Sequence, residues 1–384
     1  MKIVYIFNAL AYKGGIERIF CDKMNYLVQN YGYDISFVTF QQGNHPRSYE
    51  LDKRIKVTDL NTRFCELHRM NAVTALAKNI VLRRRLKKRL ADYLSNEKPD
   101  IVICTTSDFY ISECILDLPY RIIVESHIHM AEILETNLHK NRLLKFFCRM
   151  FDRWHFSKIN KAAALVTLTQ ADKQDWQKHI GTHIRIIPNM VTCYPEEITP
   201  YGSRPNRIVC AGRLAPQKGF DYLIEAWKRI AHKHPSWSID IFGHGDLEEN
   251  LNKQIRECGL EESISIHKPT NHIYDEYKSS ALYVLSSRYE GFGLVLIEAM
   301  SCGTPCVAFD CPNGPSELIA SGEEGLLVPL GDIDKLAEAM DWMITHKEER
   351  QQMSLNARTK AKNYTAESIM PQWTALFESI AGHP

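Results

Sequence analysis

Short apolar runs alternate with helical patterns along this 384-residue chain, and the alternation restarts after a proline-rich stretch. Before that stretch, the runs rich in β-branched residues are 3–7, 35–40, 101–104, 122–124 and 165–168. Segments 16–28 and 72–94 between them have the period of a helix. Strand-like runs separated by helical segments indicate right-handed βαβ units around a parallel sheet.

The alternation resumes beyond an irregular stretch that starts at Pro188 and also contains Pro195, Pro200 and Pro205. The strand-like runs are now 208–211, 239–242, 264–266, 282–285, 306–309 and 326–328. Because 384 residues exceed what one core usually organises, we expect two doubly wound, Rossmann-like domains that face each other across a cleft. They are predicted over 1–190 and 191–365, with the proline-rich stretch as the linker and a terminal helix in 366–384.

Composition is that of an ordinary globular protein, with 45% hydrophobic and 24% charged residues. No stretch reaches the about 18 to 20 uncharged apolar residues that span a bilayer, and the N-terminal apolar run is too short for a signal peptide. We therefore expect a cytoplasmic protein, or one peripheral on the inner face of the cytoplasmic membrane. The eleven cysteines do not form a disulfide framework. Cys302, Cys306 and Cys311 cluster without zinc-site spacing and are expected in the core.

Two carboxylates, Glu290 and Glu298, bracket a glycine loop that opens an apolar helix. Gly291 and Gly293 let backbone amides approach a ligand closely, and the helix start offers free N–H groups to an anion. Since run 281–285 reads as a buried strand, the loop lies at a strand's carboxyl end, where open α/β sheets bind ligands. This environment suits a diphosphate. The alternative is a turn and a core helix with merely solvated acids.

Cations follow another predicted strand, where Arg213 and Lys218 flank a turn that contains Pro216. Arginine gives a bidentate fork and lysine a point charge, which together suit a pyrophosphate leaving group. Taken alone, the pair also fits a solvated surface. Because these cations can balance a diphosphate, we expect neither a metal ion nor another cofactor.

A glycine pair, Gly14 and Gly15, follows the first predicted strand. It is not the Gly-x-Gly-x-x-Gly fingerprint of a dinucleotide site, so the main sequence evidence for a dehydrogenase function is missing. Paired glycines before a helix let amides approach a phosphate, although a tight turn with positive φ is the alternative.

His127 also ends a strand-like run and is expected to face the cleft. It could instead share a metal-binding face with Glu125 and His129, or be a structural histidine. At a further strand end, the segment Gly243-His244-Gly245-Asp246 is expected to border a nucleotide.

Three elements carry a family resemblance: Gly14-Gly15-Ile16-Glu17, Gly212-Arg213-Leu214 with Lys218-Gly219, and the segment from Glu290 to Glu298. In their order and spacing the chain resembles the retaining glycosyltransferases of family 4, which have the GT-B fold. The resemblance implies metal-independent transfer of a hexose or N-acetylhexosamine from a UDP-sugar to a glycan or lipid-linked acceptor, in bacterial surface polysaccharide or lipopolysaccharide biosynthesis. Alternatives are a GDP-mannose-dependent mannosyltransferase, a GT-B UDP-N-acetylglucosamine 2-epimerase and an idle sugar-nucleotide-binding protein.

The same resemblance implies residue roles. Arg213 and Lys218 stabilise the leaving diphosphate, and His127 contacts the reacting sugar. Glu290 binds sugar hydroxyls and Glu298 binds ribose hydroxyls. The donor site is completed by residues expected to act through their backbone or packing: Gly14, Gly15, Gly243, Gly291, Phe292, Gly293 and Leu294. The terminal helix is expected to return to the first domain.

Charge is divided unevenly between the halves. Residues 1–190 contain 29 Lys and Arg against 19 Asp and Glu, net +10, whereas the rest contain 18 against 27, net −9. In two segments, basic residues are interleaved with apolar ones. The first runs from Arg83 to Arg89 and the second from Lys140 to Lys161. They fit helices on an anionic membrane surface, with solvated helix faces as the alternative. Nucleic acid is not expected, because no recognised binding motif accompanies the charge.

Overall fold

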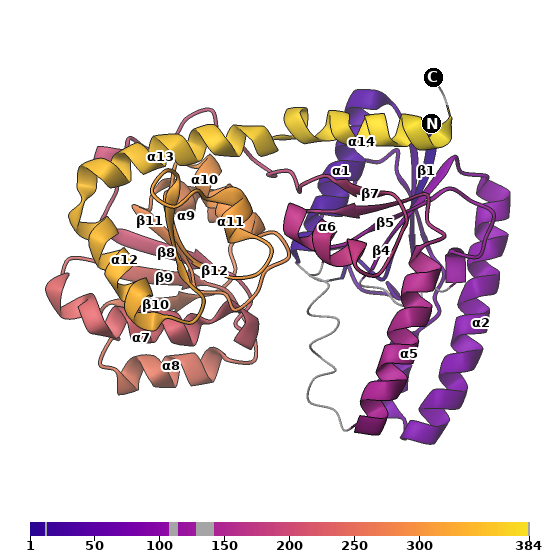
Figure 1. The fold of residues 1–384 in the computed structure, drawn as a ribbon, viewed down its shortest axis with the longest axis horizontal. Helices are drawn as coiled ribbons and strands as arrows, with labels where there is room; N and C mark the ends of the chain where they lie inside the picture. Colours follow the sequence, from indigo (N-terminus) through magenta and orange to yellow (C-terminus); the bar gives the residue numbers. More distant parts are fainter. Residues whose placement is uncertain (12–13, 107–113, 128–141, 383–384) are drawn as a thin grey trace. The chain divides into compact units, whose positions relative to one another are not determined.

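The computed structural model describes residues 1–11, 14–106, 114–127 and 142–382 (Figure 1). The chain divides into two compact units, the first made of Met1–Pro188 with Met370–Pro384 and the second of Asn189–Ile369. Each unit contains one parallel sheet with helices against it. The predicted fold class is therefore confirmed.

The first sheet has seven strands in the order β3-β2-β1-β4-β5-β6-β7, all parallel. Their bounds are β1 (Lys2–Phe7), β2 (Asp34–Thr39), β3 (Lys56–Asp59), β4 (Ile101–Thr105), β5 (Ile122–Glu125), β6 (Ala164–Thr167) and β7 (Ile184–Ile186). The five strands predicted from sequence are present. The two that were missed, β3 and β7, are the edges, where a short strand is only partly buried and needs fewer apolar residues.

Helices cover both faces of this sheet: α1 (Gly15–Tyr31), α2 (Ala72–Glu97), α5 (Arg142–Ile159), α6 (Gln170–Gln177) and part of α14 (Ala366–Ala381). Val4 and Ile6 of β1 belong to a core cluster with leucines of α2 and with Trp176 of α6. Tyr5 points to the opposite face, where its ring centre lies 5.8 Å from that of Phe20 on α1. The strands are buried from both sides, which explains their continuous apolar runs.

The second sheet has six parallel strands in the order β10-β9-β8-β11-β12-β13. All six were predicted, and their bounds are β8 (Arg207–Ala211), β9 (Ser238–Phe242), β10 (Ile264–His267), β11 (Leu282–Leu285), β12 (Cys306–Asp310) and β13 (Gly325–Pro329). The chain builds outward from β8 to β10 and then returns to the other side of β8. The topological switch point therefore lies between β8 and β11.

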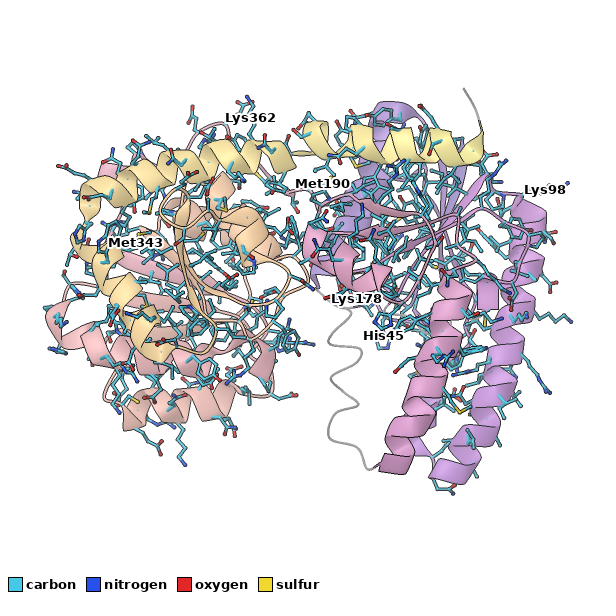
Figure 2. All side chains as sticks on the ribbon, viewed as in Figure 1. His45, Lys98, Lys178, Met190, Met343 and Lys362 are labelled. Carbon is cyan, nitrogen blue, oxygen red and sulfur yellow. The ribbon has the colours of Figure 1, made fainter. Side chains whose placement is uncertain are left out.

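The helices of the second unit are α7 (Phe220–Ile230), α8 (Glu248–Glu257), α9 (Ile273–Lys278), α10 (Leu294–Ser301), α11 (Pro315–Leu318), α12 (Ile333–Thr345) and α13 (Lys347–Ala361). Trp227 of α7 and Met343 of α12, the latter labelled in Figure 2, lie in one core cluster with β8 and β9. Short 3-10 turns complete the chain: η1 (Phe64–Arg69), η2 (Tyr201–Ser203), η3 (Pro216–Lys218), η4 (Ala231–Lys233) and η5 (Lys362–Tyr364).

The proline-rich stretch predicted as a linker is packed structure of the second unit. The Val191 N–H donates to the Tyr364 carbonyl at 2.7 Å. Arg204 is buried, and its guanidinium donates to the carbonyls of Ser280, Cys302 and Gly303. These bonds satisfy a charge that would otherwise be costly to bury.

The terminal helix α14 belongs to both units. Its first residues, up to Ile369, are part of the second unit, and from Met370 on it is part of the first. Trp373 and Phe377 are buried there, and the Phe377 ring centre lies 6.4 Å from that of Tyr33. The helix thus returns to the first unit, as the family resemblance implied.

Helix α2 has one stripe of buried leucines. We expect the substitution Leu86→Ala in this stripe to destabilise the first unit by about 2–5 kcal/mol, because it leaves a cavity in the core. Leu86 is 0% exposed and shares the stripe with Leu82, Leu90 and Leu94. The matched control is Leu76→Ala on the same helix, because Leu76 is 67% exposed and its loss should change stability by less than about 0.5 kcal/mol. Denaturant unfolding measures both. Equal stability of the two variants would contradict this packing.

Candidate functional site

The loops that follow β8 and β11 are joined directly at the switch point. The Arg288 N–H donates to the Gln217 carbonyl at 2.8 Å, and the Ser286 hydroxyl donates to the Lys218 carbonyl at 3.0 Å. The Gln217 side chain donates to the Tyr289 carbonyl at 3.1 Å. Two motifs 72 residues apart in the sequence are therefore held together as one structure.

Glycines make this close approach possible. Gly219 has φ +60°, and a Cβ there would overlap the carbonyl oxygen of Ser286. A Cβ on Gly243, at the end of β9, would overlap the carbonyl oxygen of Gly212. Gly243 is thus needed for strand-end packing. His244 and Asp246 follow it at the surface.

Lys218 and Glu290, two of the predicted site residues, form an ion pair. Lys218 Nζ lies 2.7 Å from Glu290 Oε1, and the Ser287 hydroxyl donates to the same oxygen at 2.6 Å. The Glu290 side chain is 8% exposed. No residue in the described part of the chain donates to its second oxygen, Oε2, which therefore keeps its capacity to accept.

Arg213 lies in the same loop, just after the end of β8. It is exposed, and no described residue forms a hydrogen bond or ion pair with its guanidinium. The five donors of this group remain available for an anion. The structure thus places one paired and one unpaired cation at the carboxyl end of β8.

The glutamate loop enters α10 as the sequence predicted. Gly293, with φ +84°, is the N-cap, and Leu294 begins the helix, whose first N–H groups have no partner within the helix. Gly291 is half-buried, and Phe292 is buried with its ring centre 5.9 Å from that of Tyr364. Glu298 lies inside α10, buried, and accepts from the Tyr277 hydroxyl at 3.4 Å.

A third loop, which follows β12, also contacts the glutamate loop and was not predicted as part of the site. A Cβ on Gly314 would lie 2.8 Å from the Phe292 carbonyl oxygen and 3.2 Å from Glu290 Cβ. Burial, together with the Glu290 charge, raises the pKa of the Cys311 thiol to about 12. Cys311 is buried, as expected of a core cysteine.

The glycine pair lies in the first unit, where Gly14 is the N-cap of α1 and Gly15 its first residue. Gly14 has φ −114° and ψ 165°, an extended conformation open to any residue. The alternative of a turn that requires positive φ is therefore wrong for Gly14. The Tyr49 hydroxyl donates to the Gly14 carbonyl at 3.2 Å.

His127 is held by a buried ionic network after β5. Its Nε2 lies 3.0 Å from Glu125 Oε2, while Glu125 Oε1 accepts from the ammonium of Lys23 on α1. Each of these three side chains is only 2% exposed. Because a carboxylate only accepts, the Nε2 that faces it carries a proton. The network thus buries the His127 side chain, and its expected position facing the cleft stays a prediction.

Burial and charge act in opposite directions within this network. Burial raises the pKa of Glu125, but the Lys23 charge and the His127 hydrogen bond outweigh it, so the net pKa is below the ordinary value. Burial lowers the pKa of Lys23. The Lys23 ammonium also lies 3.8 Å from the ring centre of Trp373 on α14.

A metal site at Glu125 and His127 was one alternative. Both carboxylate oxygens of Glu125 already accept from protein groups. Across the described ranges, no group of three or more His, Cys, Asp and Glu side chains is placed to bind a metal ion. His129 lies outside those ranges.

Comparison with known proteins identifies the family. The model of Glycosyltransferase Family 4 matches residues 13–193, and that of Glycosyl transferases group 1 matches residues 196–360. An uncharacterized glycosyltransferase of Haemophilus influenzae is 30% identical over 377 residues, which cover 98% of this chain and 99% of that protein. The chain belongs to the group 1 glycosyltransferases.

Two further similarities agree with this family. The amylovoran biosynthesis glycosyltransferase AmsD of Erwinia amylovora is 25% identical over 386 residues, covering 98% of this chain and 99% of that protein. The structure of S. aureus TarM, in complex with UDP, is 17% identical with a TM-score of 0.75, covering 98% and 99% of the two chains. The second likeness shows the GT-B fold. The expected class of enzyme, a glycosyltransferase, is confirmed.

The basic runs of this glycosyltransferase are only partly free. On α2, Arg89 donates to the carbonyls of Leu60 and Asn61, so it braces a loop. In the second run, Lys140 lies outside the described residues, and Lys158 and Lys161 both pair with Asp117. Hydrogen bonds from these two lysines lower the pKa of Asp117 to about 2. No helix in the described part of the chain is long and apolar enough to cross a membrane.

Gly219→Ala in the glycosyltransferase should destabilise the second unit. Positive φ alone costs a residue with a Cβ about 1–2 kcal/mol, and the overlap with Ser286 must also be relieved by separating the two loops. The matched control is Gly202→Ala, since Gly202 has open space around its Cβ position and a φ outside the positive range. Thermal unfolding compares the two. A melting temperature of Gly219→Ala equal to that of the control would refute the close approach.

Proposed function

We propose that this glycosyltransferase moves a hexose or N-acetylhexosamine from a UDP-sugar to a glycan or lipid-linked acceptor, with retention of anomeric configuration and without a metal ion. The observation that carries the proposal is the placement of Arg213, Lys218 and Glu290 on two joined loops at the switch point of the second sheet. The UDP named with the TarM structure supports the choice of nucleotide.

The donor diphosphate has a complementary surface. The Arg213 guanidinium is unpaired among the described residues, and it can bind two phosphate oxygens at once. Lys218 adds a second cation, held in place by Glu290. The α10 N-terminus adds N–H groups and the positive end of the helix dipole. These groups stabilise the leaving charge, so the reaction as proposed needs no metal.

Catalysis then depends on positioning and charge stabilisation. The C1–O bond to the diphosphate breaks on the face where the acceptor hydroxyl forms its new C1–O bond, and the hydroxyl proton leaves with the diphosphate. No protein nucleophile is required. Arg213 and Lys218 stabilise the charge that develops on the leaving group.

The remaining site residues hold the substrate. Glu290 Oε2 accepts from a sugar hydroxyl, Glu298 from the ribose hydroxyls, and His127 Nδ1 from a hydroxyl of the reacting sugar. Gly14 and Gly15 bring the N-terminus of α1 to a phosphate. We assign the acceptor to the first unit, in a pathway of surface polysaccharide or lipopolysaccharide assembly. The Erwinia relative, named for amylovoran biosynthesis, supports this type of pathway.

A thermal-shift panel of UDP, GDP and ADP with their sugars tests the donor. A ligand that binds only the folded protein raises its melting temperature, so we expect a shift with UDP and a larger one with one UDP-sugar. Shifts with GDP and GDP-mannose alone would favour the mannosyltransferase. NMR of the product anomer tests retention, and inversion would contradict it.

Lys218→Ala should lower turnover by at least about 100-fold, because the variant loses a cation that stabilises the leaving group. The measurement is release of UDP from the donor that the panel selects. Lys228→Ala, a change of an exposed lysine on α7 in the same unit, is the control and should retain activity. The melting temperature of each variant separates loss of function from loss of fold. Wild-type turnover by folded Lys218→Ala would remove the proposed role.

We further propose that α2 binds an anionic membrane surface. Positions 76, 80, 84 and 88 form one exposed stripe at helical spacing, apolar in Leu76 and Ile80 and cationic in Arg84 and Lys88. The buried leucines occupy the other side of the helix. The apolar part of this stripe can insert between lipid headgroups, while the adjoining cations bind the anionic headgroups.

Flotation with vesicles of phosphatidylglycerol and of phosphatidylcholine tests this surface. The test variant replaces four exposed cations of α2 by glutamine, namely Arg84, Arg85, Lys87 and Lys88. It keeps Arg89, which donates to a loop carbonyl. The control removes the same charge from exposed positions of the second unit: Lys228, Lys233, Lys253 and Lys268. We expect the wild type and the control to float with phosphatidylglycerol only, and the test variant to stay soluble. Equal flotation of both variants would contradict the proposal.

A further inference from the structure

The NH2 group of one buried amide beside the glutamate loop has no acceptor among the described residues. The Asn313 side chain belongs to a residue that is 7% exposed, and no group in the described part of the chain accepts from its Nδ2. A buried donor without an acceptor costs about 1–3 kcal/mol, so its presence calls for an explanation.

The backbone that carries this side-chain amide has a defined conformation. Asn313 has φ +69°, in the left-handed region that asparagine tolerates better than most residues. The next residue, Gly314, lies so close to the glutamate loop that a Cβ on it would contact the Phe292 carbonyl oxygen and Glu290 Cβ. The loop after β12 is therefore held close to the glutamate loop, with the Asn313 side chain buried beside it.

The adjoining loop offers the complementary group. Glu290 Oε1 is used by Lys218 and Ser287, and no described residue donates to Oε2. The two loops thus present one unused N–H donor and one unused carboxylate acceptor. A sugar hydroxyl donates and accepts at once and satisfies both groups. A phosphate oxygen only accepts, and the Glu290 carboxylate repels it.

We propose that Asn313 is a sugar-binding residue, whose Nδ2 donates to a hydroxyl oxygen of the transferred sugar in the site where Glu290 accepts. This inference rests on the proposed function and narrows it, since it assigns the loop after β12 to recognition of the sugar rather than of the nucleotide. Asn313 then contributes to the choice between donor sugars, because a hydroxyl of the wrong orientation leaves the buried amide unpaired.

Two substitutions remove the donor and respect the backbone. Asn313→Gly deletes the side chain and favours positive φ, and Asn313→Asp keeps the shape but replaces the NH2 donor by an acceptor. The matched control is Asn61→Gly, because Asn61 also has positive φ, at +49°, but is exposed in a loop of the first unit. All three should fold, which their melting temperatures check.

Calorimetric titration of the full chain separates sugar from nucleotide recognition. The probes are UDP alone and UDP-glucose, UDP-galactose, UDP-N-acetylglucosamine and UDP-N-acetylgalactosamine. For the UDP-sugar that binds the wild type best, we expect Asn313→Gly to raise Kd about 3- to 10-fold, the range for one hydrogen bond, and to leave the Kd of UDP within about twofold. Asn313→Asp should weaken the same UDP-sugar further, since it adds a carboxylate next to Glu290.

The outcomes distinguish this inference from the function on which it rests. If the wild type binds neither UDP nor any of these UDP-sugars, the proposed donor is refuted, and the proposed role of Asn313 is refuted with it. If the wild type binds a UDP-sugar and both variants bind it equally well, Asn313 alone is refuted. Equal weakening of UDP and UDP-sugar also refutes it, because that result assigns the residue to the nucleotide or to loop structure.

Discussion

The close approach of the loops after β8 and β11 is the constraint on which the chemistry of the second unit depends. Strand pairing brings the two strand ends together, and the absence of a side chain at Gly219 lets the following peptides touch. This contact delivers Lys218 to Glu290 and leaves Arg213 unpaired among the described residues. A neutral pair next to a free cation binds an anion without burying two repelling charges.

Two buried polar clusters, one around Glu125 and one around Glu290, differ in how completely they are satisfied. In the first unit, Glu125 uses both oxygens, and Lys23 gains a carboxylate and an aromatic face. Such a closed network specifies one arrangement of α1, β5 and α14. In the second unit, the Asn313 amide and one oxygen of Glu290 remain open among the described residues. A saturated network suits a structural frame, whereas open groups suit a ligand.

The sequence predicted most of the fold because apolar runs and helical periods report burial directly. It missed β3 and β7, since edge strands are less buried and less apolar. It also misread the proline-rich stretch, because the anchor of that stretch, Arg204, reaches carbonyls about a hundred positions away. The glycosyltransferase motifs were visible because their residues are close in sequence. Lys23 was not, since a lysine on a helix ordinarily faces solvent, and only the fold brings it to Glu125.

The contact between the loops after β8 and β11 has a consequence for how this enzyme can change. One of its bonds joins two peptide groups, from the Arg288 N–H to the Gln217 carbonyl, and any residue except proline can supply such an N–H. The side chains of Ser286, Gln217 and Arg288 donate the other bonds, so these three residues belong to the frame. Side chains that take no part in this contact are therefore free to vary while the frame that presents them persists. A new sugar preference can arise by substitution in the outer loops, and the same frame offers a designer fixed backbone positions on which to graft one.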